Sequence, residues 1–135
     1  MKLNTYVNFG GKCAEAFKYY EKHLGGMVGT MMTHGQAPDQ SKMDPAWKDL
    51  VLHARITIGG TELMAADIPK AEPMRSAYLT LGVESDAEAE RVFKALSDGG
   101  EVFMKLEETF FATRFGQCRD RFGLNWMIIH ERPMR

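Results

Sequence analysis

The chain has 135 residues, of which 44% are hydrophobic, and 17 basic and 18 acidic residues give it a formal net charge of −1. This length suits one compact domain with a real core, and the even spread of charge gives no basic stripe for nucleic acid and no sign of an anionic-membrane partner. No window approaches the roughly 20 apolar residues that span a bilayer, and the first residues lack the apolar run of a signal peptide, so we expect a cytoplasmic protein.

The first half of the chain predicts a strand, a helix and three further strands. Apolar side chains alternate in the first run and then recur at helical spacing, and Gly25-Gly26 ends the helix. A polar segment at 35–49, rich in Gly, Pro and Asp, is a candidate lid. Gly59-Gly60 is a strong signal of a two-residue hairpin. The predicted elements are a strand over 3–9, a helix over 12–24, and strands over 27–34, 51–58 and 61–66.

The second half repeats this order. Ala14-Glu15-Ala16 recurs as Ala87-Glu88-Ala89, and in both copies an amphipathic stretch and a Gly-Gly pair follow. Ser85 to Glu88 is typical of a capping box at a helix start. Such repetition indicates a duplicated unit. The predicted elements are a strand over 77–83, a helix from 86 to about 97, and strands over 101–105, 111–119 and 125–130.

The whole pattern predicts an α+β fold in which two pseudo-symmetric βαβββ modules form one domain over residues 1–135. The first module covers about 1–68 and the second about 74–132. Cys13 and Cys118 are too few for a disulfide framework, so we expect reduced, partly buried thiols.

The hairpin at Gly59-Gly60 predicts which side chains share a face. A two-residue turn places Thr57 opposite Glu62 and Arg55 opposite Met64. One face is then mixed and polar, and the other is uniformly apolar and must pack under a helix. The mixed face, a candidate for lining a binding cavity, carries His53, Arg55, Thr57, Glu62 and Met64.

The turn at 120–123 predicts the register of the last hairpin. If the turn at 120–123 pairs Arg119 with Leu124, alternation places Arg114, Gly116 and Cys118 on one face with Asn125, Met127 and Ile129. Trp126 then points to the opposite, helix-packed side. Tyr78, an aromatic body with a polar tip, is suited to stacking on a planar ligand.

Six segments spread over nearly the whole chain carry a family resemblance. They are Tyr6-Val7-Asn8-Phe9, Tyr19-Tyr20-x-x-x-Leu24-Gly25-Gly26, His53-Ala54, Leu63-Met64-Ala65-Ala66-Asp67, Glu107-Glu108-Thr109-Phe110-Phe111-Ala112-x-Arg114-Phe115-Gly116 and Asp120-Arg121-Phe122-Gly123-Leu124-Asn125-Trp126-Met127-Ile128. With them the chain resembles PhnB-like proteins of the vicinal oxygen chelate superfamily, which includes glyoxalase I, bleomycin-resistance proteins and extradiol dioxygenases. Phe111 departs from the family, which usually carries Trp there.

The resemblance implies two modules whose sheets curl around a shared cavity, usually in a homodimer. Metal-dependent relatives hold a divalent ion with four His, Gln or Glu ligands, and the matching positions here are about Asn4, Met64, Tyr78 and Met127. None is a good ligand for a hard or borderline cation, and shifting each strand by two residues recovers only Glu62. We therefore expect no metal and no other cofactor, although His53 and Glu62 leave a different metal site open.

Two functions remain open. The first is a small-molecule-binding protein, dimeric and without metal, that encloses an apolar or aromatic ligand. The second is a metal-dependent enzyme of the glyoxalase or dioxygenase type. Methyl transfer, from the demethylubiquinone methyltransferase name that some members carry, is not supported, because each Gly-Gly pair closes a helix or turns a hairpin and none forms a cofactor-binding loop. The candidate ligand-binding residues are His53, Arg55, Glu62, Met64, Tyr78, Arg114, Asn125 and Met127.

Overall fold

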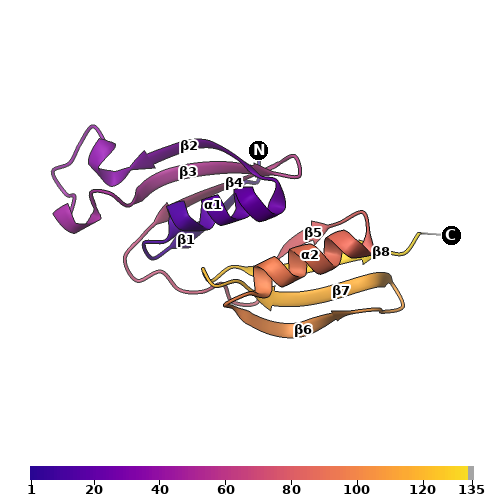
Figure 1. Cartoon of the computed structure of the whole chain (residues 1–135). Helices are drawn as coiled ribbons and strands as arrows, with labels where there is room; N and C mark the ends of the chain where they lie inside the picture. The colour runs from indigo at the N-terminus through magenta and orange to yellow at the C-terminus, as the bar shows by residue number, and fades with distance from the viewer. Residues whose placement is uncertain (134–135) are drawn as a thin grey trace. The chain divides into compact units, whose positions relative to one another are not determined.

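The computed structural model describes residues 1–133 and has two compact units, Met1–Glu72 (unit 1) and a second beginning at Pro73 (unit 2). Unit 1 contains one helix and four strands, in the predicted order (Figure 1). The ends of its helix and strands differ from the predicted ends by at most two residues. The elements are β1 (Thr5–Phe9), α1 (Cys13–Leu24), β2 (Met27–Thr33), β3 (Val51–Ile58) and β4 (Thr61–Asp67).

Unit 2 repeats the βαβββ order, which confirms the predicted fold class. Ser85 caps its helix, because the Ser85 side chain accepts a hydrogen bond from the backbone N–H of Glu88 at 3.0 Å. The elements are β5 (Leu79–Gly82), α2 (Asp86–Ser97), β6 (Glu101–Glu107), β7 (Ala112–Arg119) and β8 (Asn125–Glu131).

The two sheets have the same topology. Their strand orders are β1-β4-β3-β2 and β5-β8-β7-β6, so the first strand of each unit lies beside the last. That pair is parallel, and the other pairs are antiparallel. In each unit the helix lies across one face of its own sheet (Figure 1).

The apolar face of each sheet packs under its helix, as alternation predicts. In unit 1, Phe9 on β1 meets Phe17 on α1 edge to face, with ring centroids 6.3 Å apart, and Ile56 is fully buried. In unit 2, Trp126 and Ile128 on β8 are buried. These contacts leave the opposite face of each sheet, here called the helix-free face, without a helix of its own unit.

Two short 3-10 turns belong to the segment 35–49, predicted to be a lid. The turn His34–Gln36 leads into the segment, and the turn Pro45–Trp47 lies near its end. Its base is closed by backbone hydrogen bonds from His34 to Leu50 and from Gly35 to Lys48, at 2.8 and 2.9 Å. Its role as a lid stays a prediction. Within the described part of the chain, neither helix is long and apolar enough to cross a membrane.

Candidate functional site

The helix-free face of unit 1 brings together four of the predicted site residues. Arg55 pairs with Met64 and Thr57 with Glu62, which confirms the predicted hairpin register. The parallel strand β1 adds a residue that the prediction missed, because Tyr6 pairs with Met64 on the other side. This face carries Tyr6, Met32, His53, Arg55, Glu62 and Met64.

Three polar side chains form a chain across this face. Arg55 Nη1 lies 2.8 Å from Glu62 Oε1, and Arg55 Nε donates to His53 Nε2 at 3.1 Å. Because Nε2 accepts this bond, a neutral His53 carries its proton on Nδ1. Both members of the ion pair are nearly half exposed, so the pair contributes at most about 1 kcal/mol to stability. Arg55 and Glu62 therefore form a cross-strand salt bridge, and its main effect is to hold Arg55 in the position from which it bonds to His53.

Two rings lie close together on this face. The rings of Tyr6 and His53 lie 6.1 Å apart between centroids and are tilted by 31°. Tyr6 is 47% exposed, which leaves much of its ring open to contact. An apolar or aromatic molecule would find an amphipathic surface here.

The helix-free face of unit 2 is also aromatic. The Tyr78 and Phe103 rings meet edge to face at 6.3 Å, and the Arg119 guanidinium lies 5.3 Å from the centre of the Phe103 ring. Met127 pairs with Gln117 on the same face. Sequence reasoning missed Phe103 and Arg119, since a bulge in β6 breaks the alternation that would have placed Phe103.

The predicted register of the last hairpin is wrong by one residue. Arg119 pairs with Asn125, not with Leu124. The cause is Gly123, whose φ of +99° closes a three-residue loop in which Asp120 N–H bonds to Leu124 O at 2.8 Å. Because side chains alternate, this slip moves Arg114, Gly116 and Cys118 to the helix side of the sheet.

Gly116 confirms this placement. A Cβ atom on Gly116 would lie 2.8 Å from Cε2 of Phe93, a residue of α2. Cys118 is fully buried, and desolvation raises the pKa of its thiol to about 12. A buried thiol with a raised pKa is a poor nucleophile.

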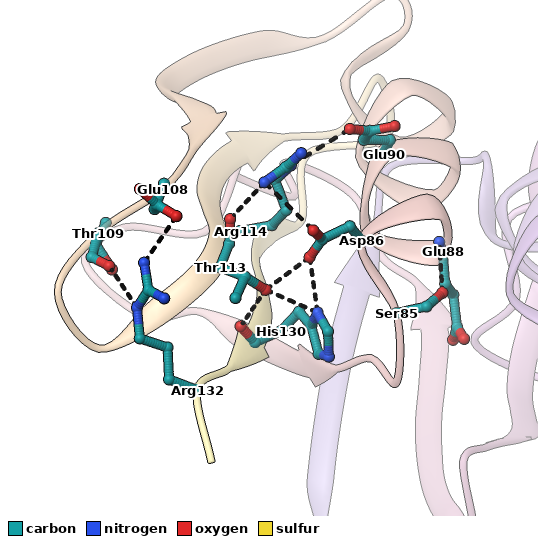
Figure 2. A network of polar contacts seen from close by, with 10 residues as sticks. All are labelled: Ser85, Asp86, Glu88, Glu90, Glu108, Thr109, Thr113, Arg114, His130 and Arg132. Atoms are coloured by element: carbon teal, nitrogen blue, oxygen red, sulfur yellow. Dashed lines mark hydrogen bonds and ion pairs between the residues drawn. The ribbon is translucent and has the colours of Figure 1, made fainter. Parts of the chain in front are cut away.

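Arg114 instead belongs to a polar network at the start of α2 (Figure 2). Its Nη1 and Nε lie 3.4 and 3.3 Å from carboxylate oxygens of Asp86 and Glu90. Thr113 donates its hydroxyl to Asp86 Oδ1 at 2.6 Å, and His130 Nδ1 lies 2.8 Å from the same oxygen. Hydrogen bonds from Thr113 and His130 lower the pKa of Asp86. A proton relay through histidine uses both ring nitrogens, one toward the carboxylate and one toward the hydroxyl. Here Thr113 and Asp86 both meet Nδ1 of His130, so this network holds the start of α2 to the sheet and does not relay a proton.

Asn125 lies on the predicted face but is 1% exposed, and its side chain serves the chain itself. Its amide nitrogen donates to Met74 O and Ala77 O at 3.2 and 3.1 Å, and its oxygen accepts from Arg119 Nε at 3.0 Å. Both N–H donors of the amide are therefore used in fixing the segment before β5.

Gly10-Gly11 lies between β1 and α1, so the prediction that each Gly-Gly pair closes a helix or turns a hairpin is wrong for this pair. Helix starts of this kind can bind anions through free N–H groups. Here the N–H groups of Gly11 and Cys13 donate to Asp67 Oδ1 at 2.9 and 3.0 Å. Val51 N–H donates to Asp67 Oδ2 at 2.9 Å. A buried carboxylate of the chain therefore fills this anion position.

The residues do not fit a glyoxalase-type metal centre. Among residues 1–133, no three His, Cys, Asp or Glu side chains gather in a way that could hold a metal ion. Met64 and Met127, at two of the positions matched to ligands, lie on the helix-free faces, but a thioether is a poor ligand for a hard cation.

Known proteins match this chain over nearly its whole length. Residues 1–129 match the family model described as 3-demethylubiquinone-9 3-methyltransferase. The chain is 31% identical to protein YjdN of Escherichia coli over 138 aligned positions, covering 95% of this chain and 94% of YjdN. It is 41% identical to protein PA1353 of Pseudomonas aeruginosa, with a TM-score of 0.86 and coverage of 98% and 99%.

More distant structures show the fold. The PhnB protein of Bacillus cereus is 24% identical, with a TM-score of 0.81 and coverage of 96% of this chain and 99% of that protein. A variant of the fosfomycin resistance protein FosX of Listeria monocytogenes, solved with Mn(II) and dihydroxypropylphosphonic acid, is 6% identical, with a TM-score of 0.69 and coverage of 98% and 93%. The chain has the fold of these proteins, and it belongs to the family whose model is described as 3-demethylubiquinone-9 3-methyltransferase.

Proposed function

We propose that this protein binds a small apolar or aromatic molecule on its helix-free faces without a metal ion. One observation carries the proposal: both faces expose aromatic and methionine side chains beside a few fixed polar groups. Tyr6, Phe103 and Met104 are 47%, 38% and 43% exposed. Small-molecule sites are lined mainly by apolar and aromatic side chains with a few placed polar groups, and these faces share that composition.

The ligand contacts that we propose are those that remain on the helix-free faces. His53, Arg55, Glu62 and Met64 supply them in unit 1. Tyr78 and Met127 supply them in unit 2, together with Phe103. Arg114 and Asn125 are omitted, since their polar groups are engaged by α2 and by the segment before β5.

The test is equilibrium binding of 2-isopropylnaphthalene to the full chain, followed by fluorescence. Met64→Glu places a charge in the middle of the unit 1 face and should weaken binding at least tenfold, because a carboxylate, even one that pairs with Arg55 on the neighbouring strand, is costly to cover with an apolar ring. Met31→Glu is the matched control, since Met31 pairs with Ala54 on the opposite face and is 37% exposed. Equal binding by both variants, or no binding by the wild type, would contradict the proposal.

Methyl transfer, the activity in the family description, is not proposed. A methyl donor such as a nucleoside-containing cofactor commonly uses free N–H groups at a glycine-rich helix start. In residues 1–133 the only pair of glycines that follows a strand and precedes a helix is Gly10-Gly11, and Asp67 accepts the N–H groups of Gly11 and Cys13 there. A metal-dependent reaction of the glyoxalase or dioxygenase type lacks a fitting donor set in the same residues.

We also propose a homodimer in a reducing, cytoplasmic compartment. The strands β2 and β6 are sheet edges and expose apolar side chains, with Met27 73% and Val102 48% exposed, and such edges favour cover by another chain. Both cysteines are buried and free, which suits a reducing compartment. Light scattering should give twice the chain mass at micromolar concentration, and a monomer would contradict the dimer. Cell fractionation tests the compartment.

A further inference from the structure

The helix-free face of unit 1 places a hydrogen-bond donor beside its aromatic surface. His53 lies on β3, two strands from Tyr6 on β1, and it is two residues along β3 from Arg55, the residue that pairs with Met64. The two rings are 6.1 Å apart between centroids. A planar ligand laid over this pair of rings would therefore touch both of them, with Met64 beside Tyr6 on the next strand.

The hydrogen bond from Arg55 fixes the tautomer of a neutral His53. Arg55 Nε donates to His53 Nε2 at 3.1 Å, and Glu62 holds Arg55 through Nη1 at 2.8 Å. Nε2 is therefore an acceptor, and Nδ1 of the neutral ring carries the hydrogen. The ion pair thus acts as a clamp that makes Nδ1 a donor.

This donor has no partner within the chain. Nδ1 makes no hydrogen bond among residues 1–133, and no buried side-chain nitrogen or oxygen in this part of the chain lacks a partner. Nδ1–H is therefore open to solvent. Arg55 Nη2 is a second available donor, since the Arg55 side chain is 46% exposed and only its Nε and Nη1 are engaged. Both open groups donate and neither accepts.

Resting on the proposed function, we infer that His53 selects aromatic ligands that carry an oxygen acceptor, such as a ring-bound carbonyl or carboxylate. The ring lies against Tyr6 and Met64, and the oxygen accepts from His53 Nδ1–H. Ligands whose polar group is a donor alone, such as an ammonium, gain no hydrogen bond from these two donors, and the acceptor beside them, Glu62, is already paired with Arg55. A bonded oxygen gains more than a methyl group of the same shape, because the methyl group covers a donor without accepting its hydrogen bond.

The experiment compares 2-acetonaphthone with 2-isopropylnaphthalene, which replaces the carbonyl by an apolar group of similar shape. The ratio of their dissociation constants is measured in the wild type and in three variants, so that the different hydration of the probes cancels. His53→Phe keeps the ring and removes the donor, and should reduce the preference for the ketone about tenfold, the equivalent of one hydrogen bond. His53→Asn keeps a donor near the position of Nδ1 and should keep the preference within about threefold.

His23→Phe is the matched control, since it makes the same change at the end of α1, and it should leave the ratio unchanged. An unchanged ratio in His53→Phe, with both probes still bound, would overturn this inference and leave the proposed function standing. A tenfold loss in His53→Asn would also overturn it, because the donor would then not be the cause. Binding of neither probe by the wild type would overturn the proposed function, and this inference with it.

Discussion

Replacing Asp67 by asparagine should destabilise unit 1 strongly. Asp67 is 1% exposed, and its carboxylate accepts three backbone N–H groups at 2.9 to 3.0 Å. An amide keeps one oxygen, which can still serve Gly11 and Cys13, but it turns an N–H donor toward the N–H of Val51. A hydrogen bond to a charged group is worth roughly 1.5–3 kcal/mol, and an unsatisfied buried donor costs a further 1–3 kcal/mol. We expect the free energy of unfolding to fall by about 3 kcal/mol.

The assay is urea unfolding at pH 7, followed by tryptophan fluorescence and circular dichroism. Asp39→Asn is the matched control, because Asp39 is exposed and accepts a single backbone bond, from Ser41 at 2.9 Å. The control should leave the unfolding midpoint unchanged within error. A loss below about 1 kcal/mol in Asp67→Asn would refute the reasoning that this carboxylate occupies the helix start as an internal anion.

Three further predictions concern unit 2 and the thiols. Gly116→Ala should lower the free energy of unfolding by about 1–3 kcal/mol, because the new methyl group would press on the Phe93 ring at 2.8 Å. Gly82→Ala is the control and should have little effect, because a Cβ atom there meets no heavy atom within 4 Å. Equal losses in the two variants would contradict this prediction. The pKa of Asp86 is lowered in the folded state, so its stabilisation is present above the unfolded value and is lost as pH falls through the folded value. Thr113→Val should therefore lower the melting temperature at pH 7 but much less near pH 2, and an equal loss at both pH values would refute the linkage. Burial raises the pKa of both cysteine thiols to about 12, so neither should react with a disulfide reagent at pH 8 until the protein is unfolded, and rapid labelling of the native protein would contradict this.

The first hairpin shows why part of the structure could be predicted from sequence. Gly59 and Gly60 both adopt positive φ, at +56° and +82°, as a two-residue turn requires, so the turn length and the register followed from the pair alone. That register gave the correct faces for His53, Arg55 and Glu62.

The last hairpin shows where prediction of the strand register from sequence fails. Asp120 and Gly123 fit two loop lengths, and the extra residue of the bulge decides which side chains face the helix. A glycine following a type I turn is itself a signal for this bulge, and using it would have placed Arg114 beside α2. Tyr6 could have been found from the alternation with Val7 and Phe9, whereas its position beside Met64 depends on a parallel pairing that sequence alone does not fix.

Binding to protein that has been stripped of metal tests the central claim most directly. The chain, purified without a metal-affinity tag and treated with a chelator, is titrated with 2-acetonaphthone, and metal content is measured by elemental analysis in the same sample. The account predicts saturable binding with less than about a tenth of an equivalent of any divalent metal, and no change when metal is added back. Binding that appears only with a near-stoichiometric metal ion would contradict it, and would direct attention to a metal site that includes His53 and Glu62.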